Sequence, residues 1–310
     1  MAISLTRGVL LLAHGDDLVL EQVGGVADDT SGGVPCTRAT RFQIASISKQ
    51  MTAVAVLLLA ERKALDLADP VARWLPRTPA HWSGITLHHL LTHTSGIGHW
   101  SDYPMIDLAG PADPDDLLAT FAAGAPLFAP GAGWSYSSPG YVLLSRVVER
   151  AADRPYGTVL DEEVFGPLGM TGSFAGTPVD RAEVAVGHED GRPVPSWDLD
   201  VVNQGTGDVW CTGPDLLTWL DVPRRGRLLT ADSVAAMTTR HALTPRDGEA
   251  YGYGCFLGPL AGEPAVHHSG YNLGFKSLAV WLPESDRRLV LLTNQAEVDP
   301  ALASAALAAR

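Results

Sequence analysis

Ser46 and Lys49 have the residue types and spacing needed for nucleophilic catalysis. If a helix begins near Ser46, Lys49 lies one turn later on the same face, within reach of the serine hydroxyl. A serine hydroxyl needs a proton acceptor beside it, and a lysine becomes one when burial or positive surroundings lower its pKa. Free N–H groups at the helix start can bind an oxyanion. The pair predicts either an acyl-transfer nucleophile with its base or an ordinary amphipathic helix start.

A long apolar segment follows the pair and would hold it rigidly. Residues 52–60 are apolar on nearly every face of a helix, which is typical of a helix in the centre of a core. We expect this helix to run from Ser46 to about Ala64, where residues 65–70 end it, and to be preceded by a short extended segment at residues 41–44.

Strand patterns occur at both ends of the chain, with helical patterns between them. Residues 8–13 and 18–23 form a hairpin pattern, and strands are expected at 251–257, 265–268, 274–282 and 288–293, with turns at Pro264, Gly270 and 283–286. Residues 46–173 are nearly all helix and loop, and 301–310 are expected to be helical. We predict an α/β (α+β) fold with an antiparallel sheet flanked by helices. Its sheet domain would comprise residues 1–45 and 185–310, its mostly helical domain residues 46–184, and the active site the cleft between them.

The amino-acid composition excludes several classes of function. The chain has 310 residues, of which 46% are hydrophobic and 18% charged, an ordinary globular balance. The net charge of −13 argues against a nucleic-acid partner, which would need clustered Lys and Arg. The three cysteines, Cys36, Cys211 and Cys255, form no C-x-x-C pair, so neither a disulfide framework nor a thiolate zinc site is indicated.

Membrane and metal binding are not expected either. The apolar run at residues 8–13 is too short to span a bilayer and lacks the features of a signal peptide, so we expect a cytoplasmic protein with no membrane partner. His88, His89 and His93 include an i, i+4 pair, but no acidic residue within the pattern completes a metalloprotease motif. We therefore expect no metal and no cofactor.

Two further short motifs accompany Ser46-Ile47-Ser48-Lys49, namely Tyr136-Ser137-Ser138 and His268-Ser269-Gly270. In this order and at these separations, the three resemble the Ser-x-x-Lys, Tyr-x-Asn and Lys/His-Thr/Ser-Gly motifs of the serine β-lactamase family. The similarity is to its class C-like and penicillin-binding-protein-like esterase branch, and it extends to residues 90–96, 136–144 and 275–294. The resemblance implies a β-lactamase/transpeptidase-like fold over almost the whole chain.

The resemblance also implies roles. Ser46 would attack a carbonyl carbon, while Lys49 and Tyr136 move its proton, charged Lys49 favouring the phenolate form of Tyr136. The oxyanion would lie on the N–H groups of Ser46 and Tyr271, and His268 would bind a substrate carboxylate or the tyrosine. Ser138, Ser269 and Gly270 would contact substrate. Aromatic side chains are candidate pocket walls, with an ordinary core or surface position as the alternative: Trp100, Tyr103, Trp197, Trp210 and Tyr271.

Two departures from the family pattern affect the expected substrate. Ser138 replaces an asparagine and offers one hydroxyl in place of an amide. His268 replaces a lysine and is largely neutral at pH 7, which disfavours β-lactamase activity. We expect a serine acyl-enzyme hydrolase of a small ester or amide. The alternatives are a transacylase of secondary metabolism, with an amine or alcohol acceptor, and a non-catalytic binding protein; the oligomeric state is left open.

Overall fold

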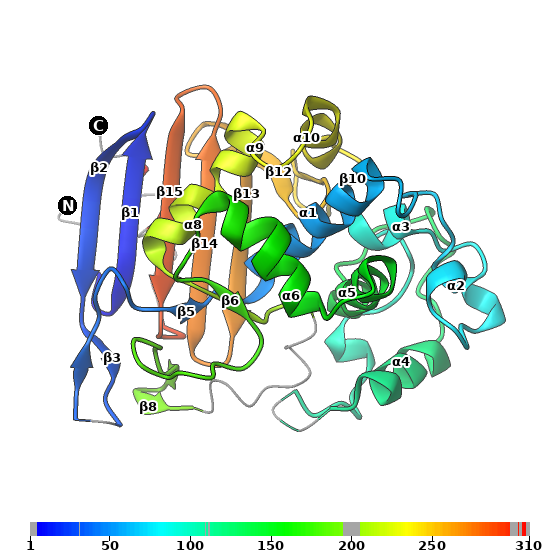
Figure 1. Ribbon diagram of the computed structural model, residues 1–310, viewed down its shortest axis with the longest axis horizontal. Helices are drawn as coiled ribbons and strands as arrows, with labels where there is room; N and C mark the ends of the chain where they lie inside the picture. The colour runs from blue at the N-terminus through cyan, green and yellow to red at the C-terminus, as the bar shows by residue number, and fades with distance from the viewer. Residues whose placement is uncertain are drawn as a thin grey trace.

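One large antiparallel sheet contains strands from both ends of the chain (Figure 1). The computed structural model describes residues 5–30, 32–108, 110, 112–194, 205–297, 303, 306 and 307. The sheet order is β10-β11-β12-β13-β14-β15-β1-β2. The bounds are β1 (Gly8–His14), β2 (Asp17–Gly24), β10 (Ala242–Leu243), β11 (Ala250–Tyr251), β12 (Phe256–Leu260), β13 (Glu263–Asn272), β14 (Phe275–Leu282) and β15 (Arg287–Thr293). Since β1 pairs with β15, with Leu11 opposite Val290, the predicted joining of the opening hairpin to the C-terminal strands is confirmed.

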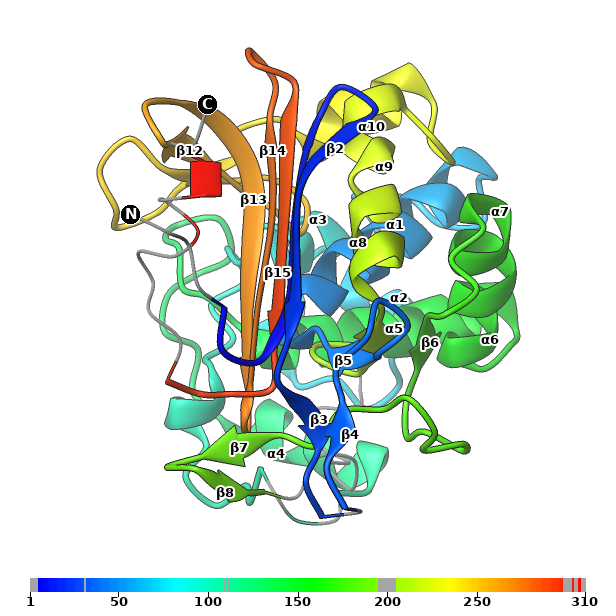
Figure 2. The same ribbon diagram turned by 90° about the vertical axis from the view of Figure 1, so that its left-hand side faces the viewer.

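Both faces of the central strands are covered, so their residues are apolar on both sides. On one face, Val9 and Leu11 join the main core, which includes Leu216 of α8 (Gly213–Trp219). On the other face, Leu10 and Leu291 belong to a second cluster that includes three described residues of the C-terminal segment, Ala303, Ala306 and Leu307. Figure 2 shows the sheet nearly edge-on, with α8 and α9 (Asp221–Arg225) against one face.

A buried helix, α1 (Ser48–Glu61), runs between the sheet and the helical part of the molecule (Figure 1). Every residue from Ser48 to Leu59 is buried, which explains why its sequence is apolar all round. Its largest helical contact is with α5 (Ser138–Ala152). The remaining helices are α2 (Val71–Trp74), α3 (Leu87–Leu91), α4 (Pro114–Ala123), α6 (Tyr156–Leu160), α7 (Gly166–Leu168) and α10 (Ala231–Met237). Short turns of 3-10 or π helix are η1 (Ala45–Ile47), η2 (Ala80–Trp82), η3 (Trp100–Asp102) and η4 (Asp161–Phe165).

Three small sheets complete the described part of the fold. They pair β3 (Val26–Asp28) with β4 (Val34–Pro35), β7 (His188–Glu189) with β8 (Arg192–Pro193), and β5 (Phe42–Gln43) with β9 (Val209–Cys211) and β6 (Phe174–Ala175). Because β5 pairs with β9, the segment before Ser46 is held as an extended strand, as the sequence predicts.

Two of the expected turns are wrong, because Pro264 and Gly270 both lie inside β13. The hairpin between β12 and β13 turns instead at Ala261 and Gly262, which have φ angles of 52° and 86°. Positive φ at both central residues is typical of the two-residue hairpin turn that matches strand twist. Pro264 follows directly, opposite Pro259. The strand expected at 251–257 is also interrupted between β11 and β12.

Some predictions remain open. The division into two domains stays a prediction, and Trp197 and most of the helix expected at 301–310 lie outside the described residues. Within the described chain, no helix combines the length and apolar character that crossing a bilayer requires.

Candidate active site

Ser46 lies in η1, the tight turn that joins β5 to α1. The turn is fixed on both sides of Ile44, whose N–H donates to the Val209 carbonyl at 2.9 Å and whose carbonyl accepts from Ser277 Oγ at 2.7 Å. Ala45, directly before the nucleophile, has a φ of 49°, a left-handed conformation that side chains rarely adopt. Such strain is typical of functional turns that the surrounding structure holds in place.

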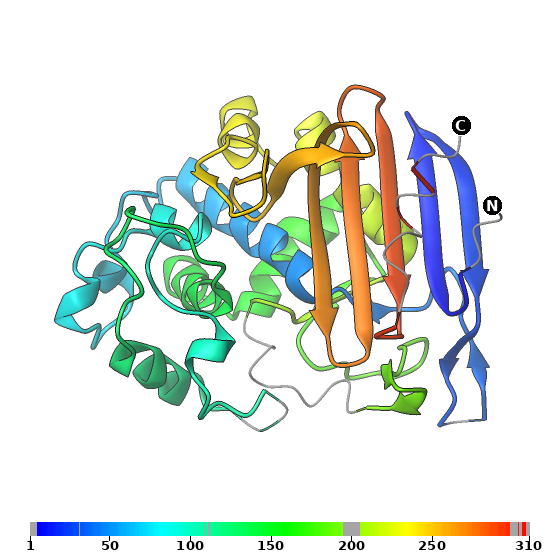
Figure 3. The ribbon, with the colours of Figure 1, turned by 180° about the vertical axis from the view of Figure 1, so that it is seen from behind.

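Gly270 of β13 allows this turn to approach the sheet. A Cβ atom at this position would lie 2.3 Å from the Ile44 carbonyl oxygen and 2.9 Å from Ala45 Cβ. The glycine is therefore required by the close approach of β13 to η1, and not by a turn. Figure 3 shows the N-terminal end of α1 meeting β13.

Lys49 directs its amine at the nucleophile. Its Nζ lies 3.0 Å from Ser46 Oγ and donates to the Thr206 carbonyl at 2.9 Å. Burial lowers the pKa of Lys49 to about 7, although the nearby Asp208 carboxyl favours the charged form. A substantial share of Lys49 is therefore neutral near pH 7, where the amine can accept the serine proton.

Tyr136 lies beside this pair, with its ring centroid 5.1 Å from Lys49 Nζ. The side chain is half-buried, and its buried hydroxyl makes no hydrogen bond of normal geometry with a described residue. Burial raises the pKa of Tyr136 well above its ordinary value, an effect that the Ser46 hydroxyl only partly offsets. This environment favours the neutral phenol and not the phenolate that the family resemblance implies.

Three histidine rings surround Tyr136 at centroid distances of 4.4 Å for His93, 5.4 Å for His99 and 6.1 Å for His268. Burial and the Lys49 amine lower all three pKa values, to about 4 for His99 and about 3 for His268. The rings are therefore neutral at pH 7.

Two backbone contacts anchor the tyrosine segment to its histidine neighbours. Ser137 N–H donates to His93 Nδ1 at 3.1 Å, and Ser138 N–H donates to His99 Nδ1 at 3.2 Å. The carbonyl of His93 also accepts from Ser135 N–H at 3.0 Å. His93 thus binds the backbone on both sides of Tyr136.

His268 does not bond Tyr136. Its Nδ1 lies 2.6 Å from the Ser269 carbonyl, and its Nε2 lies 3.2 Å from the hydroxyl of Tyr251. Since Nδ1 faces a carbonyl, it must carry the proton, and Nε2 accepts from Tyr251. The histidine is thus a neutral, fully engaged group.

The C-terminal part of β13 forms an open edge beside Ser46. The partner strand β12 pairs with β13 only as far as His267, so in the described structure Gly270 and Tyr271 have no strand on that side. The Tyr271 side chain is 56% exposed, and its hydroxyl donates to Glu189 Oε1 at 2.8 Å.

Two cavities meet at Ser46, His99 and Tyr271. The larger, about 580 Å³, is bordered also by Tyr136, Phe256, His268, Ser269, Gly270 and Lys276. The smaller, about 380 Å³, is bordered also by Trp100, Ser101, Leu108, Ser138, Thr206, Asn272 and Leu273.

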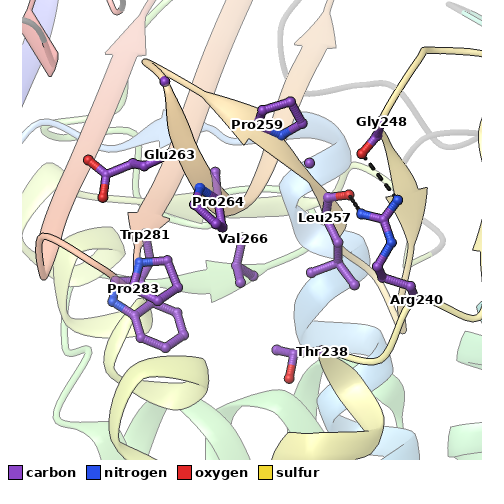
Figure 4. A pocket seen from close by; sticks show the side chains of 13 residues that line it. Thr238, Arg240, Gly248, Leu257, Pro259, Glu263, Pro264, Val266, Trp281 and Pro283 are labelled. Atoms are coloured by element: carbon purple, nitrogen blue, oxygen red, sulfur yellow. Dashed lines mark hydrogen bonds between the residues drawn. The ribbon is translucent and has the colours of Figure 1, made fainter.

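A third cavity of about 520 Å³ lies away from Ser46 at the β12–β13 hairpin (Figure 4). Its arginine, Arg240, donates to the carbonyls of Leu257 at 2.9 Å and Gly248 at 3.1 Å. No residue of the three predicted motifs borders this cavity, so it is not the candidate active site.

Of the predicted site residues that the structure describes, all but two aromatic side chains lie together. Trp210 is fully buried and stacks on Phe174 with centroids 6.1 Å apart, so it is a core residue and not a pocket wall. Tyr103 is likewise buried against Phe121 at 5.2 Å. Trp100 does border the smaller cavity.

Sequence reasoning missed several residues of the site. The sequence singles out His93 only as a possible metal ligand, although its position in the residue 90–96 similarity could have suggested a role. Asp208 and Asn272 carry no motif. Among the described residues, no three His, Cys, Asp or Glu side chains are grouped so that they could hold a metal ion.

Comparison with known proteins agrees with the family resemblance of the sequence. The model of the family described as beta-lactamase matches residues 5–310. Esterase EstB of Burkholderia gladioli is 36% identical over 208 residues, which cover 62% of this chain and 52% of the esterase, so the match spans about half of that relative.

Solved structures are similar over almost the whole chain. A penicillin-binding protein from Bacillus halodurans has a TM-score of 0.86 at 27% identity, covering 97% of this chain and 94% of that one. A D-stereospecific amidohydrolase from Streptomyces sp. has a TM-score of 0.78 at 26% identity, covering 93% and 89%. These matches confirm the predicted fold class and resemblance. With the family model spanning nearly all of its residues, the chain belongs to the beta-lactamase family of serine hydrolases.

Proposed function

We propose that this protein is a serine acyl-enzyme hydrolase, an esterase or amidase, that acts on a small ester or amide. The observation that carries the proposal is the 3.0 Å contact between Ser46 Oγ and a buried Lys49 amine whose pKa is lowered to about 7. A nucleophile with a base in hydrogen-bond reach is the arrangement that acyl transfer requires.

The reaction has two stages. Neutral Lys49 takes the Ser46 proton as Oγ attacks the carbonyl carbon, and the N–H groups of Ser46 and Tyr271 bind the oxyanion. Collapse of the tetrahedral intermediate breaks the bond between the carbonyl carbon and the alcohol or amine. The departing group takes a proton that passes from Lys49 through the Tyr136 hydroxyl. A water then attacks the acyl-serine with the same groups as base, which releases the acid and restores Ser46.

The positions of the two cavities indicate which part of the substrate each receives. A proton donor must reach the departing atom, so the larger cavity, which Tyr136 borders, takes the leaving group. The smaller cavity then takes the acyl group. Its lining residues carry no formal charge at pH 7, since the pKa of His99 is about 4, which favours a neutral acyl group.

Relatives support ester or amide hydrolysis. EstB is by name an esterase, and the Streptomyces protein an amidohydrolase. Because the pKa of His268 is lowered to about 3, this chain has no fixed positive charge at the position where the family resemblance places a lysine, and the cationic side chain of the larger cavity is Lys276 of β14. A substrate without a carboxylate at that point fits the site better than a β-lactam.

The test is the intact mass of the protein after mixing with p-nitrophenyl acetate. We expect an acetyl adduct in the wild type that clears in water, no adduct in Ser46→Ala, and slower formation in Tyr136→Phe. Clearance accelerated by added amine, with amide product, would instead support the transacylase. No Ser46-dependent adduct or turnover with a range of esters and amides would refute the proposal and favour a binding scaffold.

A further inference from the structure

His99 occupies a central position that the mechanism does not use. Among the described residues, three border both cavities, and the other two, Ser46 and Tyr271, already have proposed roles. His99 comes from the segment just before η3, on the helical side of the cleft, whereas Tyr271 comes from β13. A substrate acyl group entering the smaller cavity must therefore pass this ring.

The hydrogen bonding of His99 assigns its tautomer. Ser138 N–H donates to Nδ1 at 3.2 Å, so Nδ1 is the unprotonated nitrogen and Nε2 carries the proton. The lowered pKa keeps the ring neutral at pH 7. No described residue accepts a hydrogen bond from Nε2, which leaves this N–H available to a ligand. The same tautomer argues against His99 as a general base, because its basic nitrogen is already engaged.

Two other polar residues of the smaller cavity, Asn272 and Ser138, offer fewer hydrogen-bond donors to a ligand than their positions suggest. The amide Nδ2 of Asn272 is engaged by Gln43 Oε1 at 2.8 Å and the Gly207 carbonyl at 3.0 Å. Ser138 carries only a hydroxyl where the family pattern has an amide. The remaining surface combines the short hydroxyl side chains of Ser101 and Thr206 with Trp100, Leu108 and Leu273, which are largely apolar. His99 is half-buried, and its Nε2–H gains a hydrogen bond when a ligand or water oxygen in this cavity pairs with it.

We propose that His99 is a specificity-determining residue whose Nε2–H donates a hydrogen bond to an oxygen acceptor within the acyl group. The substrate class is then a neutral acyl donor that carries a second carbonyl, as in N-acylamino or oxo-acyl esters and amides. This proposal rests on the proposed hydrolase function, of which it names the acyl half.

A matched set of esters tests it. p-Nitrophenyl 4-oxopentanoate and p-nitrophenyl N-acetylglycinate each carry a second carbonyl, which p-nitrophenyl pentanoate lacks at similar chain length. The readout is the ratio of kcat/KM for each carbonyl ester to that for the pentanoate, corrected for spontaneous hydrolysis. One neutral hydrogen bond predicts a wild-type ratio of roughly 2- to 10-fold above that of a variant that lacks it.

Two substitutions distinguish the acceptor role of His99 Nδ1 from the donor role of Nε2. His99→Asn keeps an acceptor for Ser138 N–H but has no donor at the Nε2 position, so the ratio should fall by roughly 2- to 10-fold. His99→Gln extends an amide N–H towards the Nε2 position, so a large part of the ratio should return. His81→Asn, at an exposed histidine, is the matched control and should retain the wild-type ratio.

The outcomes of this experiment distinguish the role of His99 from the proposed hydrolase function. Ser46-dependent turnover with the same ratio in wild type and His99→Asn would overturn the role of His99 and leave the hydrolase standing. No preference for either carbonyl ester in the wild type would do the same. No Ser46-dependent turnover of any of the three esters would overturn both proposals.

Discussion

Asp208 should set the pH at which Lys49 becomes an active base. Both side chains are buried, and burial shifts their pKa values in opposite directions, to about 7 in each case. The charged forms attract each other, so the carboxylate keeps the Lys49 pKa higher than burial alone would. Asp208→Asn removes that attraction with little change in shape, and the Lys49 pKa should fall.

Coulomb's law sets an upper limit to the shift in the Lys49 pKa. Two full charges about 4 Å apart interact by about 4 kcal/mol at an effective dielectric constant near 20. The two side chains form no direct ion pair among the described contacts, and a carboxyl with a pKa of about 7 is only half ionised at that pH. These two reductions leave about 1 to 2 kcal/mol, which corresponds to about one pKa unit.

The assay is the pH profile of kcat/KM for a p-nitrophenyl ester, corrected for background. Activity requires neutral Lys49, so the wild-type profile should fall on the acid side of about pH 7, and that of Asp208→Asn on the acid side of about pH 6. The control Asp232→Asn removes an exposed carboxylate and should leave the midpoint unchanged. An acid limb that stays in place or moves to higher pH in Asp208→Asn would refute Lys49 as the titrating base.

Two further predictions concern residues that position the site. His93→Phe removes the Nδ1 acceptor and leaves the Ser137 N–H buried and unpaired, so kcat/KM should fall by roughly 10-fold or more. His93→Asn retains an acceptor and tolerates the φ of 60° at this position, so it should recover activity. Equal activity in the wild type and both variants would contradict the role of His93 in positioning the Tyr136 segment. Gly270→Ala should slow acylation of Ser46 and destabilise the fold by about 1 to 3 kcal/mol, because the added Cβ would lie 2.3 Å from the Ile44 carbonyl oxygen. Adduct formation measures the first effect and thermal unfolding the second, with Gly157→Ala as the control. An unaltered acylation rate would disprove the close approach of β13 to η1.

Local features of the site were predictable because they depend on short-range geometry. The spacing of Ser46 and Lys49 places both on one face of a helix wherever that helix forms, and the apolar residues that follow predict its burial. Apolar alternation and turn residues likewise predict the opening hairpin and the turn between β14 and β15. The order of sheet, helical and sheet patterns along the chain predicts that strands distant in sequence pair, and the order of the three motifs was sufficient to identify the family.

Other features depend on contacts between distant segments and have no local signal. The same glycine that reads as a turn in sequence, Gly270, lies inside a strand because η1 packs against it. Trp210 reads as a pocket wall but is core, since β9 pairs with β5. Burial depth sets the protonation of Lys49 and Tyr136, and Asp208 and His99 join the site only through folding. The sequence therefore predicts the types and order of the reacting groups. Their charge states and hydrogen-bond partners depend on tertiary packing, which removes these groups from water.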